Sequence, residues 1–95
     1  MTNLKTLDLS FNKINGLDFL KHCQKLEILK LEKNLITSTD GLGKLLNLVE
    51  VDLSFNMLEK IQGLHDLKKL EKLTLVNNVI QQMKDIQRIE ELTSL

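Results

Sequence analysis

The sequence predicts an α/β repeat fold, with a parallel β-sheet along one face and 3₁₀ or short α turns along the other. Three observations predict it. Leucine accounts for 22 of the 95 residues, whereas Pro, Trp and Tyr are absent. The leucines return at one fixed interval, and each period carries an apolar-x-Leu pair followed by an Asn. A heptad or a 3.6-residue helix does not return an Asn at one position every period, which excludes a coiled coil and a helical bundle.

The blocks align without a gap. They begin at Leu4, Leu26, Leu48, Leu70 and Leu92. The first reads Leu4-x-x-Leu7-x-Leu9-x-x-Asn12-x-Ile14, and the same pattern of apolar residues and Asn returns in the next three. Spacing this regular predicts one structural unit that is repeated along the chain.

The pair of apolar residues in each block predicts a short strand, because residues two apart share one face of a strand. In the first block, Leu7 and Leu9 then point inward while Thr6, Asp8 and Ser10 point outward. A single block can bury its leucines only against its neighbours. We therefore expect the strands of successive blocks to stack as a parallel sheet.

The second half of each block must return the chain to the next strand. In the third block, Ile61, Leu64 and Leu67 follow one another at steps of three, which suits a 3₁₀ or short α turn. Thr39 places a hydroxyl where the other blocks have an apolar residue. We therefore expect a locally irregular turn at residues 37–40.

One Asn per block forms the most regular polar column, which consists of Asn12, Asn34, Asn56 and Asn78. A strand that turns a corner leaves backbone N–H and C=O groups unpaired, and a buried Asn side chain both donates and accepts hydrogen bonds. We expect this column to hold the fold together and not to form a site. Replacing Asn34 by Leu is then expected to cost on the order of 1–3 kcal/mol.

The blocks resemble the leucine-rich repeat, whose signature is Leu-x-x-Leu-x-Leu-x-x-Asn-x-Leu. The third block ends in Ile61-x-Gly63-Leu64-x-x-Leu67-x-x-Leu70, which is similar to the 22-residue subclass typified by a regulatory subunit of protein phosphatase 1 and by axonemal dynein light chains. The resemblance implies a curved solenoid of four full repeats plus the start of a fifth, with the parallel sheet on the concave face. It also implies protein binding through that face.

We expect residues 1–95 to form a single domain with both ends of the sheet open. Leu4 starts the first block almost at once, and Leu92 opens a fifth block that then stops. Repeat arrays need polar capping units at their ends. The expectation is therefore a piece of a longer array, and the alternative is that the open edges pair with another copy or another chain.

Composition argues against several kinds of partner. Thirteen Lys and Arg balance thirteen Asp and Glu, so no net charge draws the chain to nucleic acid or to a membrane. No apolar run approaches the roughly 18 residues of a membrane span, and no export signal opens the sequence. A single cysteine and the absence of a glycosylation acceptor indicate a cytoplasmic location, cytoskeletal or ciliary if the axonemal resemblance holds.

Few residues could carry chemistry. Cys23 occupies a leucine position, which predicts a small buried hydrophobe. His22 and His65 are two blocks apart, so about 10 Å should separate them, too far to share a zinc ion. Asp8 and Asp52 are separated by a lysine of the block between, which gives no reason for a raised pKa. We expect no enzyme activity, no metal and no cofactor.

The candidate partner-binding site is the outward face of the predicted sheet. It comprises Thr6, Asp8, Ser10, Phe11, Ile28, Lys30, Glu32, Glu50, Asp52, Ser54, Phe55, Lys72, Thr74 and Val76. Ile28, Phe11, Phe55 and Val76 are apolar anchors in a polar surround. The two Phe share one position, and the alternative for them is to pack sideways on the Asn turn as part of the core.

The mixed charges of this face favour a protein over a nucleic acid, because phosphate binding needs a basic stripe. The expected partner surface is a helix, a loop or a flat patch. The sequence thus predicts a non-catalytic protein–protein interaction module or scaffold. The alternative is a structural repeat unit that assembles through its open ends, as a cytoskeletal or axonemal component would.

Overall fold

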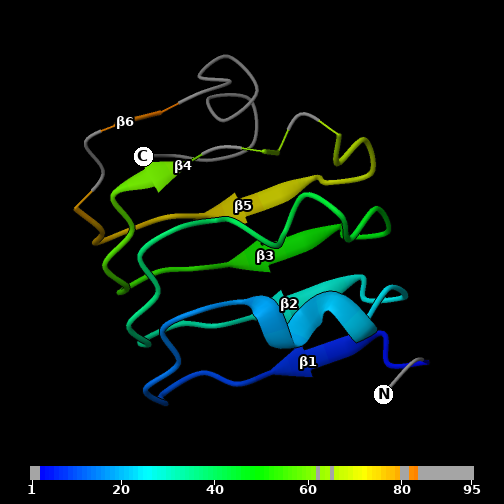
Figure 1. Cartoon of the computed structure of the whole chain (residues 1–95), viewed down its shortest axis with the longest axis horizontal. Helices are drawn as coiled ribbons and strands as arrows, with labels where there is room; N and C mark the ends of the chain where they lie inside the picture. Colours follow the sequence, from blue (N-terminus) through cyan, green and yellow to red (C-terminus); the bar gives the residue numbers. More distant parts are fainter. Residues whose placement is uncertain (1–2, 62, 65, 80–81, 84–95) are drawn as a thin grey trace.

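Four short strands form one parallel sheet in the computed structural model, which describes residues 3–61, 63–64, 66–79 and the backbone of 82–83. In order across the sheet they are β1 (Thr6–Asp8), β2 (Ile28–Lys30), β3 (Glu50–Asp52) and β5 (Lys72–Thr74). Figure 1 shows them side by side and pointing the same way. The predicted parallel sheet is confirmed.

The pairing keeps the period of the sequence. Thr6 pairs with Ile28, which occupies the same position of the next block, and Ile28 pairs in turn with Glu50 at the same offset. Hydrogen bonds between neighbouring blocks continue beyond the strands, since Leu9 N donates to Lys30 O at 2.9 Å and Phe11 N to Glu32 O at 2.8 Å. The backbones of successive blocks therefore stay paired as far as the corner where the chain leaves the sheet.

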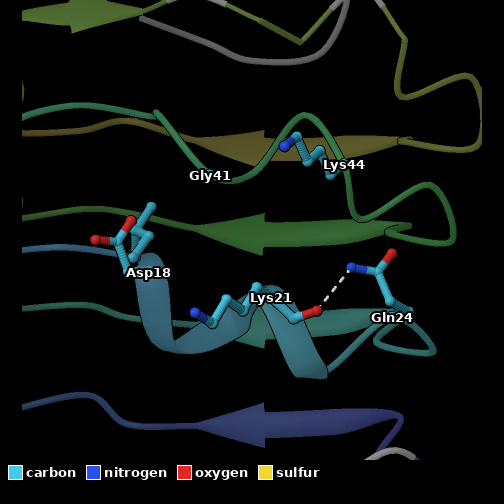
Figure 2. Close-up of a pocket in the computed structure, with 6 residues that line it drawn as sticks. Asp18, Lys21, Gln24, Gly41 and Lys44 are labelled. Atoms are coloured by element: carbon cyan, nitrogen blue, oxygen red, sulfur yellow. Dashed lines mark hydrogen bonds between the residues drawn. The ribbon is translucent and has the colours of Figure 1, made fainter.

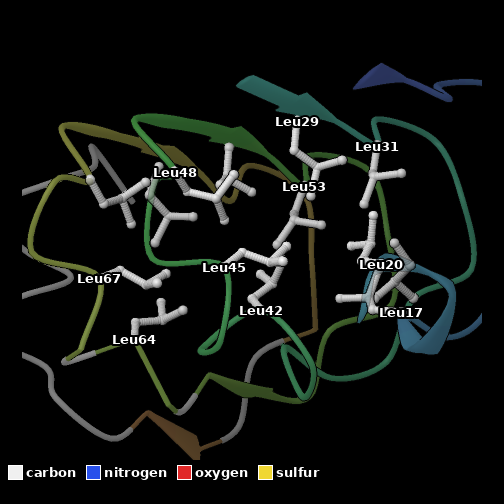
Figure 3. Packing of buried hydrophobic residues seen from close by; sticks show 14 of the residues in the cluster. Leu17, Leu20, Leu29, Leu31, Leu42, Leu45, Leu48, Leu53, Leu64 and Leu67 are labelled. Carbon is white, nitrogen blue, oxygen red and sulfur yellow. The ribbon is translucent and has the colours of Figure 1, made fainter. Parts of the chain in front are cut away.

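The core lies between the strands and the return segments. The strand side of the core contains Leu29, Leu31 and Leu53. The return side contributes residues such as Leu42 and Leu67, and none of the five has measurable exposure. Figure 3 shows these two layers of side chains meeting. Burying each leucine stabilises the fold by roughly 1.5–3 kcal/mol, so the core supplies the main driving force.

The return segment of the first block contains a 3₁₀ helix, η1 (Asp18–His22). It forms because apolar residues recur every third position, each N–H reaching the carbonyl three residues back. Leu20 N donates to Leu17 O at 3.0 Å, and Cys23 N donates to Leu20 O at 2.9 Å. The expectation of a 3₁₀ or short α turn is confirmed in this block as the 3₁₀ form.

Later blocks make the same bonds as separate turns. Leu45 N donates to Leu42 O at 3.0 Å in the second block, and Leu67 N donates to Leu64 O at 3.1 Å in the third. The step of three is therefore common to the return segments, although only η1 among the described residues becomes a helix.

A second, two-stranded parallel sheet lies on the return path, made of β4 (Lys60–Ile61) and β6 (Gln82–Met83). Ser38 extends this pairing through an isolated bridge to Lys60. The irregular turn expected at residues 37–40 is thus only partly right. The Ser38 hydroxyl accepts from Asp40 N at 3.0 Å, as in a turn, but Thr37 O accepts from Glu59 N at 3.0 Å. The next block supplies a backbone partner, which keeps the segment extended.

Candidate functional site

The candidate partner-binding residues lie in columns across the four strands. One column runs Thr6, Ile28, Glu50 and Lys72, and the next runs Asp8, Lys30, Asp52 and Thr74. Ser10, Glu32, Ser54 and Val76 follow two residues farther along, where Phe11 N and Phe55 N bond to carbonyls of that column. The structure therefore brings the fourteen residues onto one face and its adjoining corner.

The face is polar, and its members differ in exposure. Lys30 and Lys72 are exposed, whereas Ile28 is half-buried. Ser54 departs from expectation, because only 5% of it is exposed. Its N–H donates to Asp52 Oδ1 at 3.0 Å and its carbonyl accepts from Asn56 Nδ2 at 3.1 Å. Ser54 therefore holds the backbone of the corner and presents little side chain to a partner.

Charges alternate along the second column, where Lys30 lies in register between Asp8 and Asp52. A hydrogen bond from the Ser10 side chain, a second from the Ser10 N–H at 3.0 Å and the charge of Lys30 hold the pKa of Asp8 below its ordinary value. A general acid needs a raised pKa instead. Asp8 is therefore a stable surface anion, as the sequence predicted.

The Asn column behaves as expected in the second block. Asn34 is buried, and its Nδ2 donates to Leu31 O of its own block at 3.0 Å and to Leu9 O of the preceding block at 3.1 Å. Its Oδ1 accepts from Ile14 N at 3.1 Å. One side chain therefore pairs backbone groups of two blocks.

The same arrangement recurs at Asn56 and Asn78. Asn12 differs, because it is exposed and its Nδ2 donates within its own block, to Leu9 O at 2.8 Å and to Ser10 O at 3.2 Å. The prediction of a structural column is confirmed for Asn34, Asn56 and Asn78, and it is wrong for Asn12 because no preceding block covers that side chain in the described residues.

The corner after each strand carries a feature that the sequence analysis missed. Phe11, Lys33, Phe55 and Asn77, which share one position, all have positive φ, between 57° and 63°. Bulky residues adopt this left-handed conformation at a cost of about 1–2 kcal/mol each, whereas Asn tolerates it. The only sequence signal was Asn77, since no glycine occupies the column.

The two Phe of this column are not part of the core. Phe11 is 67% exposed and Phe55 is 44% exposed, so the alternative of sideways packing in the core is wrong. The Lys33 ammonium lies over both rings instead, 5.1 Å from the centre of Phe11 and 5.4 Å from that of Phe55. The left-handed corner places these side chains on the outside, where a cation on the neighbouring block stabilises them.

A hollow of about 360 Å³ lies on the return side between the first two blocks. Its lining residues are Leu17, Asp18, Lys21, Gln24, Gly41 and Lys44, and Figure 2 shows five of them labelled. Gln24 Nε2 donates to Lys21 O at 3.0 Å. The charged groups of the lining are the Asp18 carboxylate and the ammonium groups of Lys21 and Lys44, and all three side chains are exposed. The lining offers neither a nucleophile nor a base paired with one, so it has no catalytic arrangement.

No group of three or more His, Cys, Asp and Glu gathers where it could hold a metal, within the part of the chain that the structure describes. Cys23 is a free thiol with no exposure, as predicted for a core position. His22 is exposed, and His65 lies outside the described residues. In those same ranges, no helix has the length and apolar character that crossing a membrane requires.

Residues 2–44 match the family model described as leucine-rich repeats, two copies. This part of the chain is therefore similar to leucine-rich repeats. Repeats of this family generally mediate protein–protein interactions and are typically non-catalytic. Among curated proteins, none matches the chain. Beyond the matched residues, the pairing of Val51 with Leu73 keeps the offset seen between the first two repeats.

Proposed function

We propose that the chain is a non-catalytic protein-interaction module, a scaffold or regulatory segment, that binds a partner protein through its sheet face. One observation carries the proposal. The outward side chains of four parallel strands lie in register as continuous columns. A continuous, mixed-charge surface on a rigid scaffold suits recognition, because a partner can meet several side chains without reordering the backbone.

We further propose four full repeats of the 22-residue subclass, stacked as a solenoid whose concave side is the sheet face. Support comes from Asn56 and Asn78, which repeat the bonding of Asn34 in blocks beyond the family match. The constant offset between paired strands also continues as far as β5. A cytoplasmic, cytoskeletal or ciliary location is part of the same proposal, supported by the unpaired thiol of Cys23.

The partner is a protein with both signs of charge. Lys30 lies between two carboxylates, and Glu50 pairs in register with Ile28 and Lys72. A phosphate backbone would meet four carboxylates and only two ammonium groups here, which disfavours nucleic acid. A helix, loop or flat patch with complementary charges and an apolar contact for the half-buried Ile28 fits this face.

The test is a quantitative pull-down from a eukaryotic cell lysate with three forms of the chain. The sheet-face variant carries Ile28→Glu and Lys30→Glu. A matched control carries Lys21→Glu and Lys44→Glu on the return side, and circular dichroism checks that all three forms fold. We expect proteins that the native chain and the control retain, and that the sheet-face variant loses. Proteins retained equally by all three forms, or by none, would contradict binding through the sheet face.

A further inference from the structure

Exposed apolar side chains gather at one corner, where the chain leaves the sheet. This corner patch consists of Phe11, Leu35, Phe55, Met57, Val76 and Val79, each between 44% and 67% exposed. Leu46, on the return side, is the other large apolar residue that the described part of the chain leaves exposed. Scattered exposed apolar residues are ordinary, but a set confined to one corner is typical of an interaction site.

Three members of the patch stack one per repeat. Leu35 N donates to Ile14 O at 2.8 Å, Met57 N to Ile36 O at 3.0 Å and Val79 N to Leu58 O at 3.2 Å. Each residue is thus tied to the preceding repeat. Parallel strands are about 4.8 Å apart, so the three side chains form a stripe with roughly that spacing.

Charge at the corner is uneven. Lys33 lies between the Phe11 and Phe55 rings, and Lys13 occupies the first-repeat position of the Leu35 column. Neither of these two columns contains a carboxylate. Glu32 precedes Lys33 but is half-buried toward the sheet face, and Glu59 follows Met57 by two residues in the third repeat. The patch is therefore positive over its first two repeats.

We infer that the corner patch binds an amphipathic helix of a partner protein, with one apolar residue per turn and Asp or Glu at the end that faces Lys13 and Lys33. A helix rises about 5.4 Å per turn, close to the 4.8 Å between repeats, so its successive turns meet Leu35, Met57 and Val79 in order. This inference rests on the proposed protein-binding function and names both a second contact surface and the class of its ligand.

An extended peptide fits the corner less well. Side chains on one face of a strand recur at about 6.6 Å, which falls out of step with the stripe after one repeat. The backbone N–H groups of the three stripe residues are also already bonded, and adding a strand requires unpaired ones. Both arguments favour a helix.

The test is a selection against the full chain from two displayed peptide libraries. One presents single helices randomised along one face, and the other presents extended peptides randomised at alternate positions. We expect helical binders with apolar residues at steps of three and four and an acidic end. Their affinity should fall about tenfold or more on Met57→Glu or Leu35→Gln. The matched control Leu46→Glu should change the affinity less than about twofold, because Leu46 lies outside the patch.

Charge reversal tests the orientation of the helix. Lys33→Glu should weaken the selected acidic peptide and strengthen a version with Lys in place of its acidic residues. Absence of helical binders, or binders unaffected by Met57→Glu, would overturn the inference. Lysate proteins lost from the sheet-face variant but retained by Met57→Glu would overturn it as well, and would leave the proposed function standing. Lysate proteins lost only from the Met57→Glu variant would support binding at the corner patch and contradict binding through the sheet face.

Discussion

The strand side and the return side of the chain have the same sequence period, but only the strand side has the same backbone structure in every repeat. On the strand side, each of the pairs β1–β2, β2–β3 and β3–β5 keeps the same offset and direction. On the return side, the first repeat has the helix η1, whereas the second has turns and a bridge from Ser38 to Lys60. One side is uniform and the other varies from repeat to repeat.

The difference follows from what each side must satisfy. Strand backbones donate and accept hydrogen bonds between repeats, and Asn34, Asn56 and Asn78 complete that ladder, so a deviation leaves polar groups unpaired. The return side must bury an apolar residue at every third position, and most of its bonds at these positions run within one turn, as from Leu45 N to Leu42 O. Several backbone paths meet that condition, and local residues choose among them.

The strongest way to break the uniform side is Asn34→Leu, which removes a buried amide and leaves Ile14 N without its acceptor. Leu9 O and Leu31 O keep their bonds from Asn12 and Asn56. We expect a loss of about 1–3 kcal/mol in the free energy of unfolding, measured from urea transitions. Asn12→Leu is the matched control, because Asn12 is exposed and donates to carbonyls of its own repeat. It should cost under about 1 kcal/mol. Equal losses would contradict the ladder between repeats.

The return side has its own close contact, at Gly43. A Cβ there would lie 2.5 Å from Gly63 O of the next repeat. Gly43→Ala should therefore cost about 1–3 kcal/mol through overpacking. At Gly16 a Cβ would meet nothing within 4 Å, so Gly16→Ala is the control and should be neutral or slightly stabilising. The stability of the two variants is compared by thermal and urea unfolding. If Gly43→Ala is as stable as the native chain, the backbone at Gly63 moves to accommodate the added Cβ and the predicted overpacking is wrong.

At the corner, Lys33→Met tests the cation between two aromatic rings. It keeps a long unbranched side chain, one atom shorter, and removes the charge, so we expect a loss of about 0.5–1 kcal/mol. Lys13→Met on the neighbouring column is the control and should change stability little. A loss for Lys33→Met no greater than for Lys13→Met would show that Phe11 and Phe55 gain nothing from the ammonium. Urea unfolding at low salt is the measurement.

The smallest expected effect is on the titration of Asp8. Ser10→Ala removes the hydroxyl that lowers the pKa of Asp8 most, so this pKa should rise toward its ordinary value. Lys30→Met should raise it less, because the charge of Lys30 contributes least. Because the folded pKa is lowered, ionised Asp8 stabilises the fold above its unfolded pKa, and that contribution is lost as pH falls through the folded pKa. Carbon-detected NMR of the carboxylate measures both shifts, and a larger shift for Lys30→Met would reverse the assignment.

Sequence spacing predicted the features that recur by period. Leu29 and Val51 face the core, Asn34 pairs two repeats and Cys23 is buried, each as its position in the block required. Features that depend on contacts between repeats were missed. The second sheet forms because Lys60 of one repeat meets Gln82 and Ser38 of its neighbours.

The candidate site shows the same division. The columns of the sheet face were predictable, because a parallel ladder with a constant offset fixes which residues align. The exposure of each side chain within the columns was not predictable. Ser54 is buried although it occupies an outward position of the strand pattern, as Asp52 does. The corner patch was only partly foreseen, since Phe11 and Phe55 were ambiguous and Met57 was not considered.

By itself the sequence determined the repeat, its period, the parallel sheet and the Asn ladder, because each follows from residues that recur at one spacing and from backbone groups that must pair. Only the tertiary structure decided where the chain is left-handed, which return segment becomes a helix, and on which side Phe11, Phe55 and Lys33 meet. The meeting of Lys33 with the two rings depends on contacts between side chains of neighbouring repeats, whose energies are small and are set by geometry that a linear pattern does not contain.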